Sequence, residues 1–164
     1  MAGAVKIKRS QFATFINTTP SETTANYVRL GKGITSGEIS YNPESNEEIY
    51  IDEDSGTTDV TGYKPTMPVE ATAMAGDDAY DFIDSLRINR AILGDAKTDI
   101  VNVWLYKTAT GGAYPAEKQN VSIALGTFGG PGGEPAKINY TINYQGDPVK
   151  GTFNPTTKAF TATT

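Results

Sequence analysis

The sequence predicts a mainly β protein: an antiparallel β-sandwich or barrel-like subunit with a single α-helix packed on it. Strand alternation dominates, most clearly where Ile138, Tyr140, Ile142 and Tyr144 alternate with polar residues. Glycine, proline and asparagine interrupt the chain at short intervals, as is typical of β proteins with many turns. Only residues 75–94 place apolar side chains at helical spacing. Because one short helix is marginal alone in water, we expect it to dock on the sheet.

The expected helix spans about residues 77–90. Its docking stripe, at positions i, i+3, i+4 and i+7, consists of Ala79, Phe82, Ile83 and Leu86. Asp77 or Asp78 can accept hydrogen bonds from the free N–H groups of the first turn. Gly94 can adopt the left-handed conformation that ends a helix. The sequence therefore predicts both the boundaries of the helix and the side that it buries.

Before the helix we expect several short strands separated by turns. They lie at residues 11–17, 27–30, 60–63 and 69–74, with a loop at 18–26. Pro65 and Pro68 lie between the last two of these segments, and a proline pair suits an edge strand or a crossing loop. The last two segments are therefore expected outside the centre of the sheet.

A long hairpin is expected between these strands. Its arms are Glu38–Tyr41 and Glu48–Glu53, in which Ile49 and Ile51 alternate with polar residues. Residues 42–47 contain a proline and are acidic, so we expect them to form the hairpin tip in water.

The strand signal is strongest after the helix. Residues 99–107 are apolar or aromatic on both faces, which predicts a strand covered on two sides. Further strands are expected at 121–125, 138–144, 149–153 and 158–163, with turns at 129–133 and 144–148. Together with the earlier strands they are sufficient for one sandwich or barrel.

Composition limits the possible functions of the 164-residue chain. We expect one β domain over residues 11–164, preceded by a flexible arm at residues 1–10. The chain has no cysteine and no histidine, which removes disulfides, thiolate metal sites and the commonest general base. Its net charge of −5 does not suit a protein that grips duplex DNA. No apolar run is long enough to span a bilayer or to act as a secretory signal, so we expect no membrane association and synthesis in the cytosol.

The chemical motifs in the sequence are weak. Residues 129–133 are glycine-rich but lack the sequence of a phosphate loop. Residues 52–54 are acidic without the spacing of a calcium loop. The aspartates at 77, 78, 81 and 84 are explained by helix capping and the helix dipole. We therefore expect no catalytic residue, no metal site and no cofactor, and interpret the protein as a non-enzyme.

Several segments, taken in order, carry a family resemblance. They are residues 33–44, 48–53, 61–65 (Thr-Gly-Tyr-Lys-Pro), 69–71 and the helix at 78–86, followed by a G-x-x-x-x-G-T-F pattern at Gly146, Gly151 and Phe153. This order and spacing resembles the tail tube (major tail) proteins of long, non-contractile-tailed bacteriophages, over most of residues 11–161. No single motif carries the resemblance, which lies in the order and the spacing.

The resemblance implies a structural protein of the virion. Tail tube proteins form hexameric rings that stack around a tape-measure protein and end at a tail terminator. Double-stranded DNA passes through the lumen during ejection without sequence-specific binding. Expected partners are therefore further copies of this chain, the tape-measure protein, the terminator and transient DNA. The expected location is the phage tail, after assembly in the host cytoplasm.

Two surfaces follow from this implied assembly. Candidates for the lumen lining lie on half-polar strands: Glu38, Glu48, Asp52, Asn139, Thr141 and Asn143. An ordinary solvated face is the equally favoured interpretation of these strands. Candidates for contacts between rings lie in the expected tip and arm: Pro43, Glu44, Ser45, Asn46, Lys6, Lys8 and Arg9. The loop at 54–68 is a further candidate, because long exposed segments can become ordered on a partner.

Two other functions remain open. Nine tyrosines and one tryptophan on a β scaffold also suit a carbohydrate-binding or adhesive module, although such aromatics more often lie in a core or interface. Another tail component of the same fold, such as a tail terminator, is the second alternative.

Overall fold

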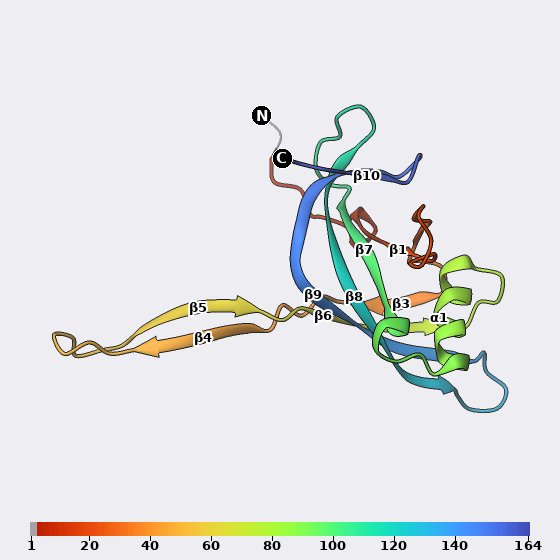
Figure 1. Cartoon of the computed structure of the whole chain (residues 1–164), viewed down its shortest axis with the longest axis horizontal. Helices are drawn as coiled ribbons and strands as arrows, with labels where there is room; N and C mark the ends of the chain where they lie inside the picture. Colours follow the sequence, from red (N-terminus) through yellow and green to blue (C-terminus); the bar gives the residue numbers. More distant parts are fainter. Residues whose placement is uncertain (1–2) are drawn as a thin grey trace.

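The computed structural model describes residues 3–164, and one antiparallel sheet dominates it (Figure 1). In spatial order the sheet is β2-β1-β7-β8-β9-β6-β3, and β10 pairs with β9 off this path. Its strands are β1 (Phe12–Asn17), β2 (Tyr27–Arg29), β3 (Ile34–Gly37), β6 (Thr66–Thr72), β7 (Lys97–Trp104), β8 (Tyr114–Gly129), β9 (Lys137–Asn154) and β10 (Ala159–Ala162). β4 (Pro43–Glu48) and β5 (Thr57–Tyr63) form a separate two-stranded ribbon. The prediction of a mainly β fold with one helix is confirmed.

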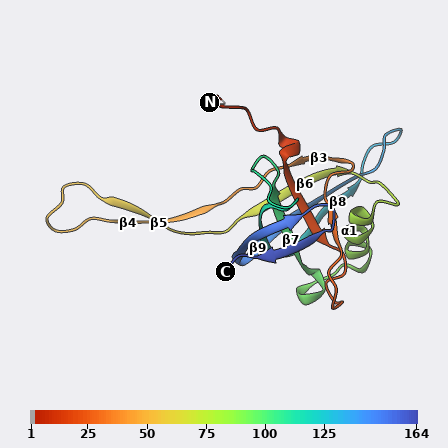
Figure 2. The ribbon, with the colours of Figure 1, turned by 90° about the horizontal axis from the view of Figure 1, so that it is seen from above.

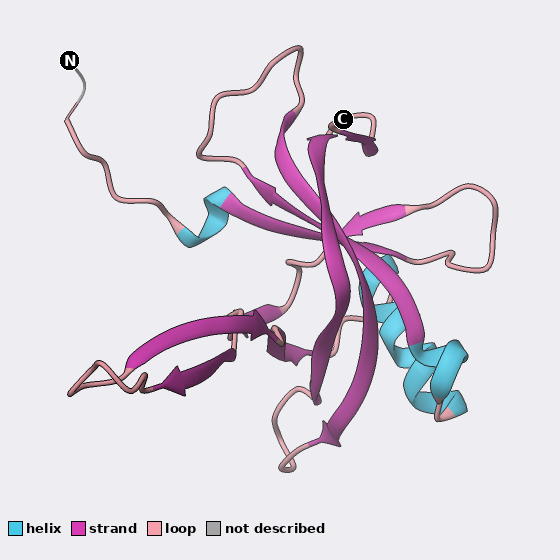
Figure 3. Cartoon of the chain, turned by 60° about the vertical axis from the view of Figure 1, so that its left-hand side comes forward, coloured by secondary structure: helices cyan, strands magenta, loops and turns pink. Residues whose placement is uncertain are grey.

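The long strands curl, so the sheet forms a half-barrel and not two stacked sheets (Figure 3). The helix α1 (Asp78–Asn89) covers one side, and short 3-10 turns stand at η1 (Arg9–Gln11) and η2 (Leu93–Ala96). Figure 2 shows the ribbon and α1 at opposite ends of the molecule. Residues 3–8 of the expected arm are exposed and contain no helix or strand, and residues 1–2 lie outside the described residues. No helix within residues 3–164 has both the length and the apolar character needed to cross a membrane.

The helix docks through the stripe expected from its spacing. Ala79, Ile83 and Leu86 are buried in a core that includes residues of β6, β7, β8 and β9, and Phe82 packs half-buried against that core. Asp77 is the N-cap, and its carboxylate accepts a hydrogen bond from the backbone N–H of Tyr80 at 3.1 Å.

The expectation that Gly94 ends the helix is wrong. The helix ends at Asn89, and Arg90 takes the left-handed conformation with φ of 45°. The N–H of Ala91 then donates to the carbonyl of Leu86 at 3.0 Å, which closes the last turn. Ala91 also packs against the core, and this contact offsets the steric cost of a non-glycine residue in that conformation. Gly94 instead lies in η2.

A second core lies on the other side of the central strands. It contains Phe15, Val101 and Phe153, with the rings of Phe15 and Phe153 centred 4.6 Å apart. Ile100 belongs to the helix-side core and Val101 to this second core, and neither side chain is accessible to solvent. The strand predicted to be covered on two sides is therefore β7.

The expected hairpin exists, but with a different register. Its arms are β4 and β5, so all but the first of the residues predicted as the tip, 42–47, lie in a strand. The predicted strand Glu48–Glu53 lies mostly in the actual tip, residues 49–56, and Glu38–Tyr41 precedes the ribbon. The alternation of Ile49 and Ile51 misled the prediction, because both faces of this ribbon are exposed and burial imposes no period on it.

The prediction that residues 69–74 avoid the centre of the sheet is also wrong. β6 lies between β3 and β9 although it contains Pro68. Thr66 exchanges two backbone hydrogen bonds with Ser40, which precedes the ribbon. The backbone nitrogen of Pro68, two residues further along β6, therefore points toward the same side of the strand, the side of β3. The last β3 residue, Gly37, pairs with Val69. Pro68 therefore lies just beyond β3, where its missing N–H costs no ladder bond.

β8 and β9 are far longer than the predicted segments. The expected turn at 144–148 does not reverse the chain, since β9 continues through it to Asn154. The register against β8 shifts there, and the amide nitrogen of Gln119 donates to the carbonyl of Gly146 at 2.8 Å. Turn-forming residues thus make an irregularity inside one strand.

Candidate functional site

The ribbon, defined as residues 43–63 of β4, β5 and their connection, projects from the body of the molecule (Figures 1 and 2). None of its residues is buried, and only Gly62 is even partly covered. Two-stranded ribbons are marginally stable alone in water. The chain therefore exposes a long element that buries no side chain against its own body.

One face of the ribbon is an apolar stripe. Its apolar members are Pro43, Tyr63 and Val60 on one side of the β4–β5 register, with Tyr41 before β4 and Ile49 just after it. Ser45 and Thr58 lie on the same side. The rings of Tyr41 and Tyr63 meet edge to face at 6.5 Å. Ile49 is 64 % exposed and Val60 is 56 % exposed, so the stripe is open to solvent. Glu47 is the carboxylate on this side, beside Ile49.

The opposite face is acidic. Glu44, Glu48 and Asp59 lie on it in register, and the Tyr50 hydroxyl donates to Glu48 at 2.6 Å. That hydrogen bond raises the pKa of Tyr50. Lys64, just beyond the ribbon, forms an exposed ion pair with Glu44 at 2.6 Å. The carboxylate of Glu44 in turn raises the pKa of Lys64.

Charge is strongly segregated along the chain. Residues 43–63 contain seven carboxylates and no lysine or arginine. The rest of the chain then carries fourteen basic and twelve acidic residues, a net charge of +2, against −5 for the whole. The ribbon is therefore strongly negative, whereas the rest of the chain is slightly positive.

A second surface is the uncovered face of the sheet. Asn139, Thr141 and Asn143 alternate along β9 with buried Ile138, Tyr140 and Ile142, so they point away from α1. Their partners on the same face are Thr66, Pro68 and Glu70 of β6 and Ser122, Ala124 and Thr127 of β8. Hydroxyl and amide groups dominate this face, with few charges among them. The structure brings these three lumen candidates together.

The other three lumen candidates lie elsewhere. Glu38 follows β3, Glu48 ends β4, and Asp52 lies in the ribbon tip, and all three are exposed. Because Glu48 and Asp52 are on the separate ribbon, they do not share a sheet with Asn139.

The residues expected at contacts between rings are all exposed. Pro43, Glu44, Ser45 and Asn46 form most of β4, on the shaft of the ribbon and not at its tip. Lys6 and Lys8 lie in the segment before η1. Arg9 is held against the body, where its guanidinium donates to the carbonyls of Phe12 at 2.7 Å and Gly37 at 2.9 Å.

A groove of about 790 Å³ that no sequence pattern indicates lies at the opening of the half-barrel, where the sheet's end strands β2 and β3 approach each other. Its walls include Arg9, Phe12, Arg29, Ile39, Tyr41 and Trp104. The guanidinium of Arg29 donates to the carbonyl of Ser10 at 3.1 Å. Within residues 3–164, neither arginine is in an ion pair with a carboxylate. These residues come from distant segments, and no local pattern links them.

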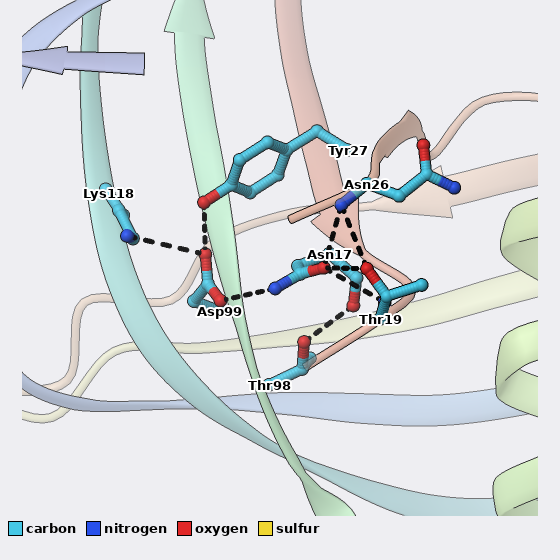
Figure 4. Close-up of polar contacts among 7 residues, drawn as sticks. All are labelled: Asn17, Thr19, Asn26, Tyr27, Thr98, Asp99 and Lys118. Atoms are coloured by element: carbon cyan, nitrogen blue, oxygen red, sulfur yellow. Dashed lines mark hydrogen bonds and ion pairs between the residues drawn. The ribbon is translucent and has the colours of Figure 1, made fainter. Parts of the chain in front are cut away.

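A buried polar cluster surrounds Asp99 on β7 (Figure 4). Its carboxylate accepts hydrogen bonds from the Tyr27 hydroxyl and from Asn17 at 2.9 Å, and Lys118 lies 4.0 Å away. Asn17 also accepts from the backbone N–H of Asn26 at 3.2 Å. Burial, followed by the bond to Asp99, raises the pKa of Tyr27, so its hydroxyl stays protonated as a donor. This cluster ties the loop at 18–26 to the sheet and is explained by that structural role.

Within residues 3–164, no three acidic side chains converge to hold a metal ion.

No protein-family model matches the chain, and a comparison with curated proteins finds no match either. Among solved structures, the chain is similar to the sheath/tube terminator of an extracellular contractile injection system (PVC) in its extended state, determined by electron cryomicroscopy. The TM-score is 0.49 and the identity 12 %, over 91 % of this chain and 99 % of that one. The ribbon, the open sheet face and the groove are features of this chain's own geometry and do not depend on that likeness.

Proposed function

We propose that the chain is a structural virion protein that self-assembles into stacked hexameric rings, forming the tail tube of a long, non-contractile-tailed bacteriophage. The observation that carries the proposal is the ribbon, which exposes an apolar stripe and an acidic face that its own chain leaves uncovered. Large apolar side chains gathered on one exposed face are typical of an interaction site. The ordered resemblance of residues 11–161 to tail tube proteins supports copies of the same chain as its partners.

The ends of the sheet support the same proposal. β2 and β3 end the main strand order and β10 ends the branch on β9, and within residues 3–164 each of the three has a strand partner on one side only. An unpaired strand edge can accept a strand from a neighbouring molecule. Where one patch meets a different patch on the next copy, a ring forms if the rotation closes. Assembly would thus satisfy the backbone groups that the monomer leaves open.

The uncovered face of β6, β8 and β9 is the surface that best suits a lumen. Asn139, Thr141 and Asn143 present neutral polar groups there. A duplex passes a neutral or acidic lining more freely than a basic one, because lysine and arginine release counterions and hold phosphates. In this proposal Glu48 and Asp52 belong to contacts between copies and not to the lumen. The tape-measure protein and then DNA occupy the channel, and no catalytic or cofactor site is required.

Two measurements on concentrated protein test the proposal directly: electron microscopy of negatively stained samples, and the molar mass by light scattering. Hollow tubes of stacked rings are the expected result. Single rings that do not stack would favour a tail terminator, the alternative of the same fold. A monomer at every concentration and salt, even beside its tail partners, would overturn self-assembly. Binding of a glycan by that monomer would favour an adhesive module.

The lumen assignment has a separate test. The substitutions Asn139→Lys and Thr141→Lys should leave tubes intact and slow DNA ejection, because a basic lining grips phosphates. Thr23→Lys with Thr157→Lys adds the same two positive charges at exposed loop positions and is the matched control. Equal ejection by both variants would place the lumen on another face.

A further inference from the structure

We infer that the groove between β2 and β3 is the receptor for the ribbon of a second copy of this chain. The inference rests on the proposed self-assembly and adds the surface to which the ribbon binds. Three observations carry it: the reach of the ribbon, its apolar tip, and the opposite charges of ribbon and groove.

The length of the ribbon prevents its tip from binding the groove of the same molecule. About ten residues separate Pro43 from the tip, which at about 3.3 Å per residue places the tip about 30 Å from the ribbon's base. That base adjoins the groove, since Tyr41 lines the groove and stacks on Tyr63 of the ribbon. The ribbon also points away from the body (Figures 1 and 2). Its tip can therefore occupy only the groove of another molecule.

The tip and the groove have matching apolar content. Ile49 and Ile51 are the aliphatic side chains of the tip, and Ile51 is fully exposed. The groove offers Phe12, Ile39 and Trp104 on its walls. Burying a large aliphatic side chain stabilises a contact, whereas leaving it in water favours unspecific aggregation. A groove of about 790 Å³ is large enough to receive several side chains of the tip.

The charges are complementary. The ribbon carries seven carboxylates and no basic residue. Arg9 and Arg29 in the groove donate to backbone carbonyls, so their positive charges are not neutralised within the molecule. Glu38 is the single carboxylate on the groove's walls. Arginine binds carboxylates through two parallel hydrogen bonds, which would orient the ribbon as well as attract it.

The contact is head to tail. Each copy has one ribbon and one groove, so binding one neighbour through the ribbon leaves the groove free for another. A heterologous contact of this kind builds chains or closed rings and does not stop at a dimer.

Engineered disulfides test the contact, and the absence of native cysteine gives a clean background. The pair Ile51→Cys and Ser36→Cys places one thiol on the tip and one on the groove wall. Mild oxidation should give a ladder of covalent multimers larger than a dimer. The control pairs Ile51→Cys with Ser85→Cys, an exposed position on α1. An equal ladder from the control, or no ladder from the first pair while the protein assembles, would overturn the inference.

Charge reversal gives an independent test, which distinguishes a lost contact from a misfolded groove. The groove variant Arg9→Glu with Arg29→Glu, and the ribbon variant Glu47→Lys with Glu48→Lys, should each weaken self-association at least tenfold. All four substitutions in one chain should restore it to within a few-fold of the parent, which a merely misfolded groove could not do. Lys150→Glu with Lys158→Glu is the control and should change little.

The two proposals fail differently. Tubes that form normally from the groove variant would refute the receptor groove and leave the tail-tube function standing. A parent chain that never self-associates would refute both.

Discussion

Shortening the ribbon separates folding from assembly. In the β4–β5 register Asn46 pairs with Asp59, so residues 47–58 can be replaced by Asn-Gly, which forms a two-residue hairpin turn. The replacement removes the apolar tip and five carboxylates, and leaves the chain with no net formal charge. The rest of the sequence is unchanged.

The expected loss of stability is small because no residue of the removed segment is buried. Changes at surface sites without special contacts usually alter the free energy of unfolding by less than about 0.5 kcal/mol. We allow about 1 kcal/mol for the lost ribbon ladder. In a domain of this size that lowers Tm by about 2–4 °C. Assembly should nevertheless be lost, because Ile49, Ile51 and five of the seven ribbon carboxylates are gone.

The loss of stability is measured by thermal and urea unfolding, monitored by circular dichroism at concentrations where the parent is monomeric. The loss of assembly is measured by electron microscopy and light scattering. A fall of several kcal/mol in the free energy of unfolding would show that the ribbon supports its own body. Tubes formed by the shortened chain would show that it is not an assembly element. Either result refutes the reasoning.

Three further predictions concern the body of the domain. Ile83→Ala removes a side chain that is 1 % exposed and should lower the free energy of unfolding in urea by about 2–5 kcal/mol. Its control, Ile88→Ala, changes a side chain on the same helix that is 60 % exposed and should lower it by less than about 1 kcal/mol. Equal losses would mean that α1 is not docked. Gly151→Ala would drive a methyl group into the backbone of β10, so hydrogen exchange should show faster exchange in β10, and unchanged protection would contradict the contact. Burial raises the pKa of Glu117, which means that the folded state favours its protonated form and loses stability as pH rises from about 4 through that raised value. Glu117→Gln should therefore gain stability relative to the parent over that pH range, and a constant difference across pH 3–8 would exclude the effect.

Local patterns predicted the body of the fold well where burial imposes a period. The helix stripe at Ala79, Ile83 and Leu86 and the two-sided strand around Val101 are both found in the cores. The predictions failed where burial is absent. Ile49 and Ile51 alternate as a strand would and yet lie in an exposed tip, while the polar segment 43–48 is a strand.

The candidate surfaces divide in the same way. Asn139, Thr141 and Asn143 share one face of β9, as their period-2 spacing required. Glu48 and Asp52 do not join them, because they lie on the separate ribbon. The concentration of seven carboxylates in residues 43–63 was visible in the sequence and, properly weighed, would have singled out the ribbon.

The sequence by itself determined a mainly β domain with one docked helix, its apolar faces and its segregated charge, since these depend on the spacing of neighbouring side chains. Only the tertiary structure decided the strand order, the half-barrel's opening and the groove. Arg9, Arg29 and Trp104 are brought together by strand pairing across the sheet. That pairing depends on contacts between residues far apart in the chain, and no local period encodes it.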